Sequence, residues 1–65
     1  MIKVTAHDKL NREWRQVREI SFDERGEIEK VKLDTYCFFA ENGTLKCLDL
    51  KIEDEDGKIL FYRSL

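Results

Sequence analysis

Few residues in this chain have types and spacings suited to catalysis. The single histidine, His7, precedes Asp8, but neighbouring residues of a strand point to opposite faces, so the pair would not share a site. The only serines are Ser21 and Ser64, and neither lies in the strand–turn–helix context of a serine nucleophile. The sequence also contains no glycine-rich phosphate loop. We therefore predict a protein that is not an enzyme, with no catalytic residue and no cofactor.

The candidate metal ligands are too few or badly spaced. A structural zinc ion usually takes four ligands, and the chain has two cysteines and one histidine. The acidic stretch 53–57 resembles a calcium loop, but the first and last ligand positions would be Ile52 and Arg63. We expect no metal site. Cys37 and Cys47 are expected to face each other across a hairpin as reduced, small apolar residues.

A cluster of basic and aromatic residues is the main candidate for binding nucleic acid. Arg12, Arg15 and Arg18 surround Trp14, and arginine beside an aromatic ring suits single-stranded nucleic acid. The net charge of the chain is −2, however, and a nucleic-acid binder usually has a basic excess. Nucleic-acid binding on a small barrel through these three arginines is therefore the alternative hypothesis.

The leading hypothesis is a protein-interaction module. Aromatic residues and arginine dominate the binding energy of protein interfaces, and exposed edge strands accept a strand from a partner. The partner would be another protein or a second copy, so that the chain acts as a small inhibitor, an adaptor or a homo-oligomer. The predicted partner-binding residues are Trp14, Tyr36, Phe38, Phe39 and Tyr62.

The elements that must position these residues are indicated by a repeated loop. Three segments, 24–28, 41–45 and 55–59, share an acidic residue, any residue, glycine, a polar residue and an aliphatic residue. A three-residue hairpin loop often ends in a position with positive φ, which glycine adopts without steric cost. Three hairpins are therefore expected, with pairs Asp23–Glu27, Ala40–Thr44 and Asp54–Lys58. The predicted strands are 14–22, 27–39, 44–53 and 58–64, with 2–6 as a further strand.

Residues 8–19 fit two structures. Leu10, Trp14 and Val17 follow the spacing of one helix face, and Asp8 is a suitable N-cap. As a strand, the same segment would place Trp14 and Ile20 on one face. Both interpretations remain open, with the strand slightly favoured.

The predicted fold is mainly β: one antiparallel β-meander of four to five strands, with α+β as the alternative if residues 8–19 form a short helix. Apolar residues would lie on both faces of such a sheet, whereas an open sheet usually has one apolar face. Curling of the sheet, a helix laid across it, or another chain would cover the second face.

Length and composition predict one small domain, residues 1–65. Apolar residues make up 42% of the chain, which favours a folded domain over a disordered one. No stretch is apolar enough for a signal peptide or a membrane span, so we expect a cytoplasmic protein without membrane contact. Short proteins without catalytic motifs are often encoded by phages or mobile elements, and such an origin is expected here.

Overall fold

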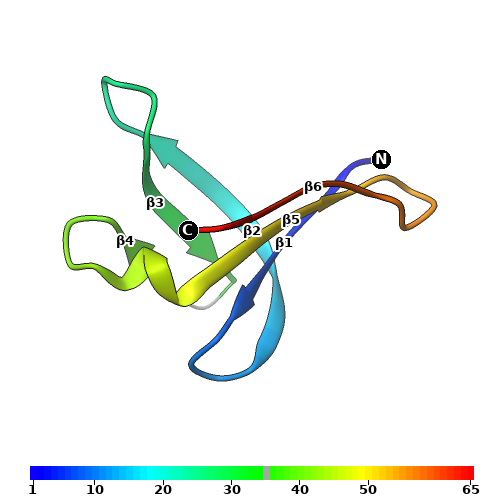
Figure 1. The fold of residues 1–65 in the computed structure, drawn as a ribbon, viewed down its shortest axis with the longest axis horizontal. Helices are drawn as coiled ribbons and strands as arrows, with labels where there is room; N and C mark the ends of the chain where they lie inside the picture. Colours follow the sequence, from blue (N-terminus) through cyan, green and yellow to red (C-terminus); the bar gives the residue numbers. More distant parts are fainter. Residues whose placement is uncertain (35) are drawn as a thin grey trace.

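The computed structural model describes residues 1–34 and 36–65. In these residues the regular elements are six β-strands and one 3-10 helix. In chain order they are β1 Lys3–Asp8, β2 Glu13–Phe22, β3 Ile28–Leu33, β4 Cys37–Phe39, η1 Thr44–Cys47, β5 Leu48–Glu53 and β6 Ile59–Ser64. The prediction of a mainly β protein is therefore confirmed (Figure 1).

All six strands belong to one antiparallel sheet, in the order β4-β3-β2-β1-β5-β6. The predicted simple meander is wrong, because β1 lies inside the sheet between β2 and β5. The ladder between β1 and β5 begins where Lys3 lies opposite Glu53. The predicted strand 27–39 is also two strands, since β3 and β4 fold back and pair with each other.

Two of the three glycine loops form the predicted hairpins. Between β5 and β6, the N–H of Asp54 donates to the carbonyl of Lys58 (3.0 Å), and the N–H of Gly57 donates to the carbonyl of Asp54 (3.1 Å). Gly57 has a φ of 83°, in the left-handed region that favours glycine. The Asp54 carboxylate accepts the N–H groups of Asp56 and Lys58, both at 2.9 Å. The loop between β2 and β3 repeats this arrangement around Asp23.

The middle glycine loop does not form the predicted hairpin. Gly43 closes a turn with Ala40 (3.1 Å), but the chain then enters η1, and the predicted pair of Ala40 and Thr44 is wrong. Position 40 is alanine where the two hairpin loops have aspartate, so no carboxylate holds the returning backbone. The expected pairing of Cys37 with Cys47 is wrong for the same reason. Cys37 instead pairs into β3, and both thiols are free.

The strand interpretation of residues 8–19 is confirmed from Glu13 onward. Residues 9–12 form a tight turn between β1 and β2, and Arg12 takes a φ of 56° there. The alternative N-terminal helix is therefore wrong. β2 is long enough to pair with β1 through its first half and with β3 through its second half.

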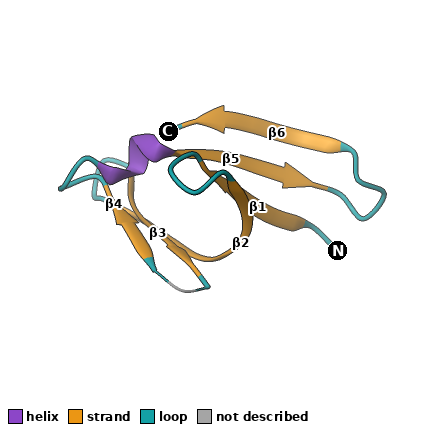
Figure 2. Ribbon diagram, turned by 90° about the horizontal axis from the view of Figure 1, so that it is seen from below, coloured by secondary structure: helices purple, strands orange, loops and turns teal. Residues whose placement is uncertain are grey.

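The sheet curls on itself and encloses the core (Figure 2). Buried apolar side chains come from β1, β3, β4, β5 and η1, namely Ala6, Val31, Leu33, Phe38, Leu45, Leu48 and Leu50. The curled sheet thus encloses one apolar face, the inner one, and leaves the outer face exposed. β6 lies outside this core on the far side of β5, and all six of its residues are exposed.

Candidate interaction surface

β6 presents an exposed apolar run at one edge of the sheet. Its first four residues, 59–62, are large and apolar, and each is between 42% and 55% exposed. A soluble domain seldom exposes four consecutive apolar residues unless they serve a function. The run marks β6 as a candidate binding element.

The free edge of β6 also offers backbone hydrogen-bonding groups. β6 is the last strand of the sheet and pairs only with β5 in the described residues. The N–H of Leu65 donates to the carbonyl of Leu48, and alternate residues of an antiparallel strand face the same neighbour. The backbone of Phe61 therefore faces β5, whereas the N–H and C=O groups of Tyr62 and Ser64 point to the free edge.

Side chains of β6 lie on both faces of the sheet. Phe61 lies opposite Ile52, on the inner face that also carries the buried Leu50. Tyr62 lies opposite Lys51, on the outer face that points away from the core. A strand added to this edge would therefore find apolar contacts on both of its faces.

Trp14 lies on the outer face as well. Its ring centroid is 5.0 Å from that of His7, and Lys51 Nζ lies 4.0 Å from the centroid of the Trp14 ring. A lysine at this distance makes a cation–π contact, which holds the indole in place. Trp14 nevertheless remains 46% exposed. The outer face thus presents Trp14 and Tyr62, residue types that dominate protein interfaces.

Asp49 connects β1, β5 and β6 on the outer face. Its carboxylate accepts a hydrogen bond from Ser64 Oγ (2.7 Å) and lies 3.5 Å from Lys9 Nζ and 3.8 Å from His7 Nδ1. The hydrogen bond from Ser64 is the main cause of a lowered pKa at Asp49; burial opposes it, and the charge of Lys9 adds to it. Because Ser64 donates to the carboxylate, His7 is not placed to take its proton, as a serine nucleophile requires.

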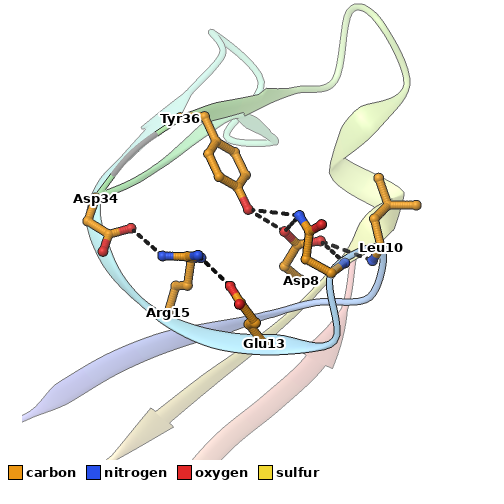
Figure 3. A network of polar contacts seen from close by, with 7 residues as sticks. Asp8, Leu10, Glu13, Arg15, Asp34 and Tyr36 are labelled. Atoms are coloured by element: carbon orange, nitrogen blue, oxygen red, sulfur yellow. Dashed lines mark hydrogen bonds and ion pairs between the residues drawn. The ribbon is translucent and has the colours of Figure 1, made fainter.

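A buried polar cluster stabilises the turn between β1 and β2 (Figure 3). Asp8 is fully buried, and its carboxylate accepts hydrogen bonds from Tyr36 Oη (2.5 Å), Asn11 Nδ2 (2.7 Å) and the N–H groups of Leu10 and Asn11. Burial raises the pKa of Asp8, but these bonds, led by that of Tyr36, outweigh it and lower the pKa below its ordinary value. The cluster therefore joins the turn to the residue that precedes β4.

The three arginines of the alternative hypothesis lie in different surroundings. Arg15 forms ion pairs with Glu13 and Asp34 (Figure 3). Arg12 lies in the turn before β2, and Arg18 lies at an irregularity in the pairing of β2 with β3. Because Arg15 is engaged with two carboxylates, it does not join the other two arginines in a free basic surface.

The five aromatic residues predicted to bind a partner do not form one surface. Trp14 and Tyr62 are exposed on the outer face. Phe38 is only 5% exposed and belongs to the core, and the half-buried Tyr36 packs against it with ring centroids 5.2 Å apart. Phe39 is exposed on β4, at the opposite edge of the sheet.

The sequence-based prediction missed the remaining apolar residues of β6. Ile59, Leu60 and Phe61 precede Tyr62 without interruption. The signal was available, because side chains alternate along a strand, so four apolar residues in a row must occupy both faces. Such a strand exposes apolar side chains unless both of its faces are covered.

Thr5 on β1 allows a test of side-chain packing on the outer face. It lies between Gln16 and Lys51 of the neighbouring strands, and its hydroxyl is buried without a hydrogen-bond partner in the described residues. Thr5→Val removes an unsatisfied hydroxyl, so we expect a stabilisation of about 1 kcal/mol. The melting temperature should rise by roughly 4–8 °C.

Thermal unfolding of Thr44→Val is the matched control. The Thr44 hydroxyl accepts the N–H of Phe39 at 2.9 Å, so the same exchange should lower the melting temperature there. A Thr5→Val protein that melts below the wild type would show that the hydroxyl has a partner.

Neither metal ligands, nor membrane-spanning helices, nor similarity to known proteins indicate a function for the described residues. Within residues 1–34 and 36–65, no three His, Cys, Asp or Glu side chains gather closely enough to hold a metal ion. The same residues contain no helix with the length and apolar character needed to span a bilayer. Comparison with protein-family models, curated proteins and solved structures found no match for this chain. Function must therefore be inferred from the geometry of the surface.

Proposed function

We propose that the protein is a non-enzymatic protein-interaction module that binds an extended segment of its partner along the free edge of β6. One observation carries this proposal: β6 combines outward-facing backbone groups with four consecutive exposed apolar side chains. A strand added at this edge pairs with the backbone of Tyr62 and Ser64. It also covers apolar surface on both faces of β6.

The outer face supports the same proposal. A partner that extends past the edge meets Tyr62, then Lys51, then Trp14. The contacts of Trp14 with Lys51 and His7 fix its ring before binding, which reduces the entropy that association removes.

In this role the chain acts as a small inhibitor, an adaptor or a self-associating protein, and it needs no cofactor. We place it in the cytoplasm, where Cys37 and Cys47 stay reduced. A phage or a mobile element is the source we propose for a binding protein of this size.

Photo-crosslinking at single positions tests the proposal. The photoreactive residue p-benzoylphenylalanine replaces Phe61 on β6 or, as the control, Phe22 at the end of β2, which is 59% exposed. In lysate of the source cells, we expect a crosslinked protein from position 61 and none from position 22.

The product should form equally well when nuclease or high salt is added to the lysate before irradiation. Loss under either condition would instead support nucleic-acid binding, for which affinity falls steeply with salt. Equal products from both positions, or none from position 61, would contradict binding at β6.

A further inference from the structure

We propose that the segment bound at β6 is β6 of a second copy, paired antiparallel with Tyr62 opposite Tyr62. This inference rests on the proposed function and names its partner. A two-fold axis perpendicular to the sheet relates the copies, and the two six-stranded sheets join into one continuous sheet.

The backbone supports Tyr62 as the centre. With an axis perpendicular to the sheet, the inner faces of both copies lie on the same side of the joined sheet. Each residue must therefore lie opposite a residue whose sequence number differs from its own by an even number. The N–H and C=O groups of Tyr62 point to the free edge, so a central Tyr62 pair exchanges two hydrogen bonds. If Phe61 were central, every hydrogen-bonded pair would involve Leu60, which the irregularity in the β5–β6 ladder displaces.

The side chains favour the same register. With Tyr62 central, Phe61 of each copy lies opposite Arg63 of the other on the inner face. In the described residues Arg63 has no acidic partner within ion-pair distance, so its guanidinium is free to stack on the phenyl ring. If Arg63 were central, two like charges would face each other. The register centred on Tyr62 therefore keeps the two Arg63 side chains apart and places each beside an aromatic ring.

The exposed run explains why a second copy fits better than a polar segment. β6 exposes apolar side chains on both faces, so its partner strand must also be apolar on both faces. Amphipathic strands, apolar on one face only, leave half of the run in water. β6 itself has apolar side chains on both faces. In the register centred on Tyr62, the two Tyr62 rings lie side by side on the outer face, and the stem and guanidinium of Arg63 cover Phe61 on the inner face.

Two substitutions of Tyr62 distinguish the contribution of its backbone N–H to the dimer from that of its side chain. Tyr62→Pro and Tyr62→Thr both remove the phenol, but only proline removes the N–H that points to the free edge. Because that N–H does not face β5, the β5–β6 hairpin should still form, which circular dichroism checks. Light scattering over a concentration series should give a dimer of the 7.8 kDa chain for the wild type and Tyr62→Thr. Tyr62→Pro should raise the dissociation constant on the order of 100-fold.

Hydrogen exchange in the wild type is the second measurement. The amides of Tyr62 and Ser64 should become protected as the concentration rises, and isotope-filtered NMR should show contacts between Phe61 of one copy and Arg63 of the other. A monomer at the highest soluble concentration, with both amides exchanging freely, would overturn the dimer. A different protein crosslinked at position 61 would then still support the interaction module, whereas no product would remove both proposals.

Discussion

Replacing Leu33 with alanine is expected to remove a large part of the free energy of unfolding of the protein. Leu33 on β3 is fully buried, in one cluster with Leu48 and Leu50 of β5. A buried Leu→Ala change costs about 2–5 kcal/mol, because it removes apolar contacts and leaves a cavity. A chain of 65 residues has a free energy of unfolding of roughly 3–10 kcal/mol, so this one substitution would remove about half of it.

Denaturation followed by far-ultraviolet circular dichroism and by Trp14 fluorescence measures this loss. Trp14 lies on the outer face, away from Leu33, but the shared core should make both signals change at one denaturant concentration. Leu10→Ala is the control, since Leu10 is 71% exposed and its loss should change stability by less than about 0.5 kcal/mol. Separate transitions, or equal effects of the two substitutions, would show that the core does not unite the sheet.

Asp8→Ala should cost about 3 kcal/mol, because it leaves the Tyr36 hydroxyl and the turn N–H groups without their acceptor. The melting temperature should fall by on the order of 15 °C. Asp34→Ala removes a half-exposed carboxylate from Arg15 and should cost less than about 1 kcal/mol. A double-mutant cycle with Tyr36→Phe should show coupling to Asp8 but none to Asp34. Additive effects of Asp8 and Tyr36 would be incompatible with the cluster.

The same carboxylate predicts a pH dependence. Its folded-state pKa is lowered, so the ionised form stabilises the fold above the unfolded pKa of about 3.9. That stabilisation is lost as the pH falls through the folded-state pKa, and Asp49 contributes in the same direction. In Asp8→Asn, the free energy of unfolding should therefore fall less between about pH 6 and about pH 3 than in the wild type. An unchanged dependence would show that the fold does not lower the pKa of Asp8.

The glycine loops show how far local structure could be predicted from the repeated sequence pattern. All three glycines take positive φ, as predicted, yet only two loops return as hairpins. The residue before the shared pattern decides the outcome, because Asp23 and Asp54 bind the returning backbone and Ala40 cannot. The repeated pattern was recognised, but the aspartate that accepts the backbone N–H groups lies one position before it.

The long-range features could not be read from local patterns. Pairing of β1 with β5 joins segments far apart in the chain, and neither segment carries a local signal for the other. The burial of Asp8 depends on Tyr36 reaching it from beyond β3, so spacing alone did not reveal the cluster. Of the predicted binding residues, Phe38 became core because β4 folds back on β3.

The position of β1 inside the sheet has a consequence for folding kinetics. The hairpins form between neighbouring segments, whereas even the nearest residues of the central ladder, Asp8 and Leu48, are separated by most of the chain. Closing so long a loop is slow, so this ladder sets the folding rate. During synthesis β1 leaves the ribosome before β5. The edge of β1 that pairs with β5 therefore stays unpaired until residues 48–53 have been synthesised.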